Sequence, residues 1–210
     1  MTKRLFGRKG FTLVELIVVI AIIGVLAAIL VPTMIGWITA SKVQSVNSTA
    51  ASLRKALMNF MTTADVQGYG IYIGSANTAE LVFVVDGNGE WTLTNSDPTV
   101  FCQRGTDMVW SGSGSGKANQ PKVGITNAED LLCIELANAV PDVTNAVIWS
   151  YISGNGCRYV CYCTETTAYN SSTFPTATAF DSGIYSWNQK DPGITSDGLT
   201  VGTAPVLALG

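Results

Sequence analysis

Glu15 is the only charged residue between Phe11 and Ser41, in a stretch that is otherwise almost continuously apolar through Ile38. Keeping a carboxylate at the edge of hydrocarbon costs about 2–3 kcal/mol, so we expect this one to have a partner. Cleavage of the Gly10–Phe11 bond would create a free α-amino group four residues before Glu15. An ammonium and a carboxylate at this spacing lie on one face of a helix. The spacing therefore predicts an ion pair, either within one chain or between neighbouring chains.

A simpler interpretation of Glu15 needs no second group. A carboxylate in the first turn of a helix meets the positive end of the helix dipole. Its side chain can also extend toward the lipid headgroups while its stem stays in the apolar region. The residues taken alone leave both interpretations open.

The residues around this bond resemble the processing site of type IV prepilins and pseudopilins. The similarity lies in the run from Lys9 to Leu16 and extends along the first quarter of the chain. It implies that residues 1–10 form a basic leader, removed by a membrane prepilin peptidase that cuts after Gly10. It also implies N-methylation of Phe11, and contact between Glu15 and the Phe11 amine of an adjacent subunit during assembly.

The apolar run is long enough to cross a membrane. Leu16–Ile38 contains 23 residues, and about 20 residues span a bilayer core of about 30 Å. A secretory signal has a shorter apolar region, followed by its cleavage site. We therefore expect 11–38 to stay with the mature chain and to span the lipid bilayer before assembly. The positive-inside rule predicts a cytoplasmic N-terminus, because four cations precede the span: Lys3, Arg4, Arg8 and Lys9.

Composition excludes several classes of function. Loss of the four leader cations lowers the formal charge from −3 to −7, so bulk charge disfavours nucleic-acid binding. The chain contains no histidine, which rules out a Ser-His-Asp triad and a His-ligated catalytic zinc. We predict no enzymatic activity, no cofactor and no metal site.

One long helix is predicted from residue 11 to residue 62. Its first half is apolar all round, and its second half carries an amphipathic pattern with steps of three and four residues. Gly24 and Pro32 weaken the first half, and we expect a kink there; the prepilin resemblance includes both residues. The predicted buried stripe is Val43, Val46, Ala50, Leu53, Leu57 and Phe60, with Lys42, Arg54 and Lys55 on the exposed side.

Residues 63–210 read as a β-rich globular domain outside the cell. Two pairs of β-forming segments flank glycine-rich turns and predict β-hairpins, Glu80–Val85 with Glu90–Thr94 and Ala146–Ile152 with Cys157–Thr164. A short capped helix is predicted at Leu131–Ala139, and short strands at Ile184–Trp187 and Leu199–Val201. Together with the long helix, this predicts an α+β fold in which the helix packs on an antiparallel sheet.

The five cysteines all fall in this outer part, where disulfides are the default. Counting by two along a strand places Cys157, Cys161 and Cys163 on one face, so we expect them to reach Cys102 or Cys133 rather than one another. The alternative of a zinc site is weakened by the C-x3-C-x-C spacing. The pairing itself stays open.

Other candidate sites are weaker. A calcium site at Asp181, Asp191 and Asp197 lacks a fixed loop pattern, so a solvated acidic surface is the better prediction. For the tryptophans of the outer domain, packing in the core is favoured over an exposed carbohydrate-stacking face. A mobile loop is expected at Ser111–Gly116. The tryptophans meant here are those of the outer domain: Trp91, Trp110, Trp149 and Trp187. Glycosylation patterns occur at Asn47 and Asn170.

The resemblance and the residues favour a structural subunit of a type IV pilus-like filament, serving adhesion or motility. Its expected partners are identical or related pilin subunits, the prepilin peptidase and an assembly platform in the membrane. A pseudopilin of a secretion or DNA-uptake system is the main alternative. A minor pilin that grips a polysaccharide or host surface, and a simple membrane-anchored domain, are the others.

Overall fold

The computed structural model describes residues 10–66, 71–73, 78–96, 100–102, 113–154, 156–164, 174–187, 193–195 and 198–209. The chain divides into two compact units, Met1–Ser41 and Lys42–Gly210. Helix α1 (Leu13–Val66) contributes its first part to one unit and its second part to the other.

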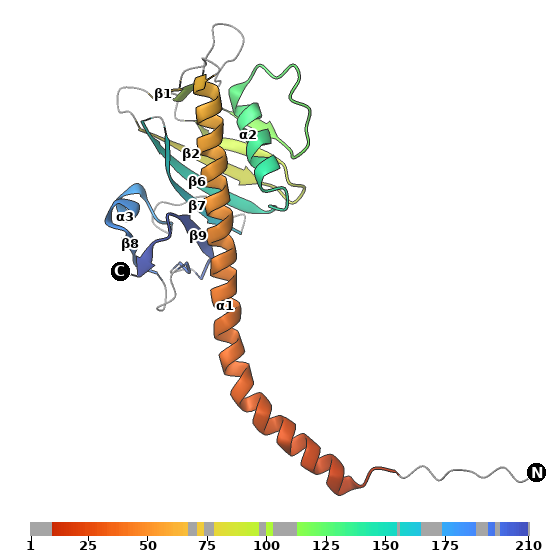
Figure 1. Cartoon of the computed structure of the whole chain (residues 1–210). Helices are drawn as coiled ribbons and strands as arrows, with labels where there is room; N and C mark the ends of the chain where they lie inside the picture. Colours follow the sequence, from red (N-terminus) through yellow and green to blue (C-terminus); the bar gives the residue numbers. More distant parts are fainter. Residues whose placement is uncertain are drawn as a thin grey trace, which may run out of the picture. The chain divides into compact units, whose positions relative to one another are not determined.

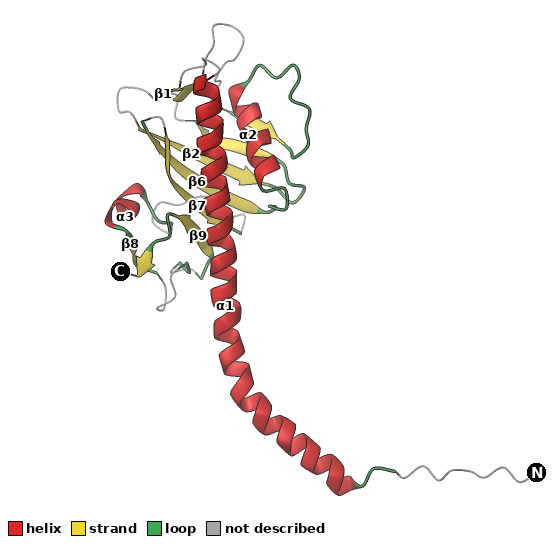
Figure 2. Ribbon diagram, in the orientation of Figure 1, coloured by secondary structure: helices red, strands yellow, loops and turns green. Residues whose placement is uncertain are grey.

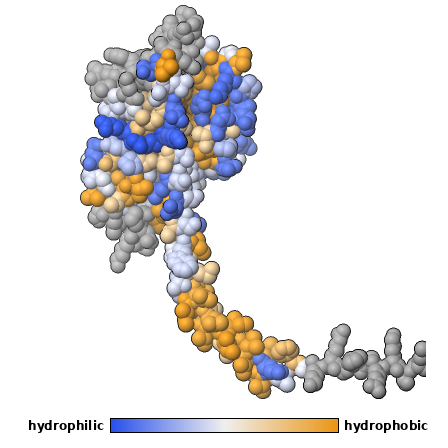
Figure 3. Space-filling model, viewed as in Figure 1, coloured by the Kyte–Doolittle hydropathy of each residue, from blue (hydrophilic) through white to orange (hydrophobic). Residues whose placement is uncertain are grey.

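The N-terminal part of α1 is apolar on all sides. Its side chains from Leu13 to Ile38 are exposed, and Figure 3 shows its visible surface as mostly hydrophobic. The helix continues through Gly24 and Pro32, so neither residue ends it. It begins two residues after the predicted start and ends four residues after the predicted end. A helix that is apolar all round buries its surface in lipid or in other chains rather than in its own domain.

The second part of α1 packs through one face only. This confirms the predicted stripe in its central positions, whereas Val43 and Phe60 are only half-buried. Arg54 is also half-buried, so its predicted place on the exposed side was wrong. Its Nε donates to two backbone carbonyls of the sheet. The buried residues are Val46, Ala50, Leu53, Leu57, Met61 and Ala64.

A six-stranded antiparallel sheet, in the order β5-β3-β2-β6-β7-β9, forms the centre of the second unit. Both predicted hairpins are confirmed, because β2 pairs with β3 and β6 pairs with β7. The strands are β2 (Thr78–Val85), β3 (Trp91–Ser96), β5 (Gly114–Gly116), β6 (Ala146–Ser153), β7 (Gly156–Cys163) and β9 (Val201–Ala204).

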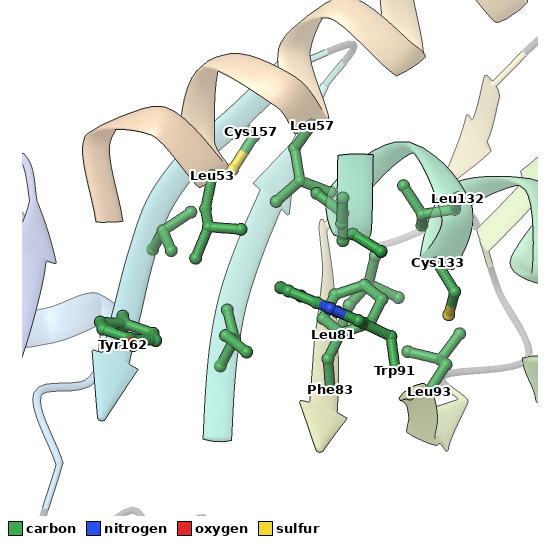
Figure 4. Close-up of a cluster of buried hydrophobic side chains, with 14 of the residues drawn as sticks. Leu53, Leu57, Leu81, Phe83, Trp91, Leu93, Leu132, Cys133, Cys157 and Tyr162 are labelled. Atoms are coloured by element: carbon green, nitrogen blue, oxygen red, sulfur yellow. The ribbon is translucent and has the colours of Figure 1, made fainter. Parts of the chain in front are cut away.

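Two hydrophobic layers cover the sheet. On one face, α1 and α2 (Ala128–Ala139) lie across the sheet (Figures 1 and 2). They pack against a cluster that includes Leu81 and Phe83 (Figure 4) and Ile148. On the other face, α3 (Ala177–Ser182) and the C-terminal segment pack against a second cluster that includes Trp149. Strands in the described part alternate between these layers because successive side chains point to opposite faces. The α+β fold with a long helix on an antiparallel sheet is confirmed.

Smaller elements complete the described residues. Helix α2 begins at Ala128, three residues before the predicted start, with Asn127 capping it through its side chain. The predicted strand at Ile184–Trp187 is shorter, and the one at Leu199–Val201 was placed too early, because β9 runs from Val201 to Ala204. The remaining strands are β1 (Ile71–Ile73), paired with β4 (Val100–Cys102), and β8 (Ile184–Tyr185), paired with β10 (Ala208–Leu209).

The loop predicted at Ser111–Gly116 is wrong for its second half. Gly114–Gly116 forms the edge strand β5, whereas Ser111 and Gly112 lie outside the described residues. Added Cβ atoms at Gly114 and Gly116 would overlap Glu129 and Ile134 of α2. The glycines here serve close packing of strand against helix rather than mobility.

Candidate functional site

The predicted cleavage junction leads directly into the first turn of α1. Gly10 and Phe11 are exposed and precede the helix, which starts at Leu13. Residues 1–9, with the four leader cations, lie outside the described residues. An exposed, non-helical bond ahead of a helix is open to a protease, because its backbone N–H and C=O groups are not held in the hydrogen bonds of a helix.

Glu15 forms a reciprocal cap with Thr12 at this point. The Thr12 backbone N–H donates to Glu15 Oε2 at 2.8 Å, and the Thr12 hydroxyl donates to the same oxygen at 2.7 Å. The Glu15 backbone N–H is 3.3 Å from the Thr12 hydroxyl oxygen, which accepts it. This is the capping-box arrangement, whose sequence signature is a threonine followed three residues later by glutamate. The signature is visible in the sequence, but neither interpretation of Glu15 from the sequence included Thr12.

The cap uses one carboxylate oxygen and leaves the other open. Within the described part of the chain, no hydrogen bond reaches Glu15 Oε1. An ionised carboxylate accepts through both oxygens. Glu15 is therefore able to cap its own helix and to accept from an incoming ammonium at the same time.

Gly24 and Pro32 lie in the exposed part of α1. A Cβ added at Gly24 would meet no atom within 4 Å, so packing inside this chain does not require glycine there. Next to Pro32, the Thr33 hydroxyl donates to the Leu30 carbonyl at 2.8 Å. A kink at these residues stays a prediction.

The four cysteines whose side chains are described are all buried. Cys133, Cys157 and Cys161 are free thiols, Cys163 follows Cys161 by two residues, and the side chain of Cys102 is outside the described set. No disulfide therefore joins any two of the four described cysteines, contrary to our expectation for them. Burial raises the pKa of the Cys133 and Cys157 thiols to about 12 and that of Cys161 above its ordinary value.

The prediction that Cys157, Cys161 and Cys163 share one face is wrong. Cys157 points toward α1 beside Leu53 (Figure 4), whereas Cys161 and Cys163 belong to the opposite layer. The cause is a β-bulge, in which Tyr151 pairs with Tyr159 while the next residue of β6, Ile152, already pairs with Cys157. One extra residue in a strand reverses the facing of everything before it.

Side chains of α1 hold this bulge in place. Arg54 Nε lies 3.2 Å from the Cys157 carbonyl oxygen and 2.9 Å from that of Arg158. The Met58 sulfur accepts a hydrogen bond from the Cys157 backbone N–H at 3.0 Å. Arg54 and Met58 lie one turn apart on the same face of the helix, so together they satisfy the bulged backbone.

The tryptophans of the globular unit belong to its core, as the sequence favoured. Trp91 and Trp149 are fully buried and Trp187 nearly so, whereas Trp110 lies outside the described residues. The Trp149 ring stacks on Phe180 with the ring centroids 6.1 Å apart. These three indoles therefore form no exposed carbohydrate-stacking face.

The structure describes Asp181, one of the three acidic residues of the candidate calcium site, so that site stays untested. Asp181 accepts a hydrogen bond from the Tyr159 hydroxyl, while Asp191 and Asp197 lie outside the described residues. Within the described ranges, no three His, Cys, Asp or Glu side chains come together. Of the glycosylation candidates, Asn47 uses its side-chain oxygen to accept from the Thr203 backbone N–H at 2.8 Å, and Asn170 is not described.

Among the helices that the structure describes, α1 is long and apolar enough to cross a membrane, and its most apolar stretch is not buried in the structure. Comparison with protein families places the prokaryotic N-terminal methylation motif at residues 5–31. That match covers the junction, the capping box and the apolar start of α1.

Known proteins similar to this chain are pilus components. The type IV narrow pilus major component PilA5 of Thermus thermophilus is 36% identical over 104 residues, which cover 47% of this chain and 82% of that protein. A type IV major fimbrial protein FimA of Dichelobacter nodosus is 36% identical over 91 residues, 43% of this chain and 57% of that protein. A fimbrial protein of Dichelobacter nodosus is 26% identical over 153 residues, 71% of this chain and 88% of that protein. No solved structure matches the chain. With the methylation motif, the capped apolar helix and a relative matched over most of its length, the chain belongs to the type IV pilin family.

Proposed function

We propose that this chain is a structural subunit of a type IV pilus-like filament, stored in the cytoplasmic membrane through residues 11–38. The observation that carries the proposal is the exposed apolar half of α1, joined to the methylation motif. Leu16, Ile20 and Ile23 are each more than half exposed, a cost in water that lipid or neighbouring helices remove. The names of the similar proteins, major pilus and fimbrial components, support filament formation.

Processing is the first step of the proposed pathway. A prepilin peptidase removes residues 1–10 after Gly10 and methylates the new amine of Phe11. The exposure of Gly10 and Phe11 ahead of the helix supports access to this bond. The cations of the leader keep this end in the cytoplasm, so 63–210 form the domain outside the cell.

Assembly is the second step, with other pilin subunits and a membrane platform as partners. Subunits exchange lipid contacts for helix–helix contacts along the apolar half of α1. Glu15 Oε1 accepts the Phe11 ammonium of a neighbouring subunit while Oε2 keeps its bonds to Thr12. This pairing neutralises both charges in a medium of low polarity and fixes the axial step between subunits.

The similar proteins favour a pilus subunit over a pseudopilin of a secretion or DNA-uptake system, because their names describe pilus and fimbrial components. Adhesion or motility would then be the task of the filament. Recognition of a polysaccharide or host surface has weaker support, since the described tryptophans of the globular unit are buried.

Mass spectrometry of the mature protein combined with immunogold microscopy tests the proposal. We expect N-methyl-Phe11 as the terminus and long surface filaments labelled by antibody to this chain. A Gly10→Val variant should keep its leader and form no filaments, while Gly87→Ala, in a surface turn, serves as a matched glycine control. A stable Met1 or Thr2 terminus contradicts the processing step. Correct processing with only short periplasmic assemblies identifies a pseudopilin.

A further inference from the structure

Trp37 is the exception among the tryptophans that the structure describes. Its side chain is 77% exposed, whereas Trp91, Trp149 and Trp187 are buried. It lies near the end of the apolar part of α1, one residue before Ile38. An indole combines a large apolar body with an N–H donor that requires a partner. Neither water nor a hydrocarbon core satisfies both parts of this side chain.

The spacing between Phe11 and Trp37 matches a bilayer with its headgroup regions. Twenty-six residue steps separate them, and α1 is helical from Leu13 onward. At 1.5 Å per residue this is about 39 Å, against about 40–45 Å for a bilayer including its interfaces. When Phe11 lies at the cytoplasmic interface, Trp37 therefore reaches the outer one.

The polar side chains on either side of Trp37, those of Thr33 and Thr39, do not require water. Thr33 and Thr39 donate their hydroxyl hydrogens to the carbonyls of Leu30 and Ile35, at 2.8 and 3.1 Å. Such internally bonded hydroxyls are tolerated inside a membrane. The first cation beyond the span is Lys42, which is exposed. Trp37 thus stands where the lipid-compatible part of the helix changes to the part that needs water.

We propose that Trp37 anchors the stored precursor in the outer-leaflet interface, with its ring among the glycerol and headgroup region of phospholipids. The interface supplies apolar contact for the ring and water or ester carbonyls for the indole N–H. This anchor sets the depth of the helix and holds Gly10 and Phe11 at the opposite membrane surface. The inference rests on the membrane-stored subunit of the proposed function.

Depth-dependent fluorescence quenching of the full-length chain in phosphatidylcholine–phosphatidylglycerol vesicles tests the anchor. Quenching lipids carry a spin label either at the headgroup or deep in the acyl chain. Subtracting the signal of a Trp37→Phe variant isolates Trp37 from the other tryptophans. We expect the headgroup label to quench Trp37 about twofold more than the deep label, as for a residue of the aromatic belt.

A second variant calibrates depth within the same helix. Ile29→Trp, made in the Trp37→Phe background, moves the indole eight residues, about 12 Å, toward the bilayer centre. The deep label should quench this variant more strongly. The anchor is overturned if the deep label quenches Trp37 as strongly as the headgroup label or more strongly. It is also overturned if neither label quenches Trp37 while the protein floats with the vesicles. Failure of the protein to float with vesicles instead overturns the membrane-stored subunit, and the anchor with it.

Discussion

Asn47 of α1 accepts a hydrogen bond from the backbone N–H of Thr203, on the edge strand β9, at 2.8 Å. The neighbouring outward N–H of the strand, that of Val201, donates to the Gly193 carbonyl at 2.7 Å. At the other edge of the sheet, Asp130 of α2 accepts from the Ser115 backbone N–H at 2.8 Å. Helix side chains and a loop thus occupy donors on both edges. Capped edges resist strand addition by another chain, which is compatible with the proposed assembly through the helix.

Replacing Asn47 tests this edge cap. We expect Asn47→Ala to lower the free energy of unfolding by about 1–3 kcal/mol, because the Thr203 N–H loses its acceptor in a partly buried place. Asn47→Asp keeps an acceptor oxygen at the same position and should lose less. Urea denaturation of the full chain in detergent measures both variants. Equal losses for the two would show that the hydrogen bond contributes little.

Gly202 tests how closely β9 approaches α1. A Cβ at this position would overlap the backbone carbonyl of Val46, which has no flexible side chain to move aside. We expect Gly202→Ala to destabilise the fold by about 3 kcal/mol or more, as for severe overpacking. Gly87→Ala is the matched control, because its Cβ would only touch the side chain of Asn145 at 3.4 Å. Similar unfolding midpoints for both variants would contradict the close approach.

Three substitutions separate the two roles of Glu15. Glu15→Gln keeps an oxygen for the cap with Thr12 but removes the charge, while Glu15→Ala removes both. Thr12→Ala removes the hydroxyl of the cap and keeps the charge. If the carboxylate pairs with a neighbouring ammonium, both Glu15 variants should lose most filaments although their leader is still removed. Thr12→Ala should retain them.

Sheared-filament yield and the mass of the mature chain measure the outcome of these three variants. Normal filaments from Glu15→Gln would reduce the role of Glu15 to capping its own helix. Loss of filaments in all three variants would show that assembly requires the hydroxyl of the Thr12 cap as well as the Glu15 charge.

The buried thiols predict loss of stability at alkaline pH. Burial raises the pKa of Cys133 and Cys157 from 9.0 to about 12, so the folded state favours the protonated thiols. Their contribution is complete below pH 9, the value for the unfolded chain, and is lost as the pH rises toward 12. The pKa of Tyr159 and Tyr162 is also raised, by a hydrogen bond to Asp181 and by burial respectively, and acts in the same direction.

Denaturation midpoints at pH 8 and pH 10.5 check this thiol prediction. The wild-type midpoint should fall between these values, and Cys157→Ala should show a smaller fall because one titrating thiol is gone. At pH 8, a thiol reagent should modify these cysteines only after unfolding. Rapid modification of Cys157 in the native chain, or identical falls in midpoint for both proteins, would contradict the burial of Cys157.

Local patterns were sufficient for much of this molecule. The apolar run followed by a three-and-four periodicity predicted α1, and paired β-forming segments around glycine-rich turns predicted both hairpins. These signals are local because a helix repeats every 3.6 residues and a strand every two. The motif from Lys9 to Leu16 is likewise contiguous, which is why the family was recognisable from so short a run.

Only the tertiary structure decided where several of these residues point. Cys157 faces α1 because a bulge at Arg158 reverses the alternation of side chains along β7. Arg54 and Met58, about a hundred positions earlier, hydrogen-bond to the backbone of this bulge. Gly114–Gly116 pairs with β3 as a strand, and at Gly114 and Gly116 helix α2 approaches too closely for a side chain. The sequence by itself determined an apolar helix with Glu15 at its start and a β-rich unit after it. The face to which a side chain points, the close approach of two elements and the capping of sheet edges all depend on contacts between distant segments. A local sequence pattern does not contain those contacts.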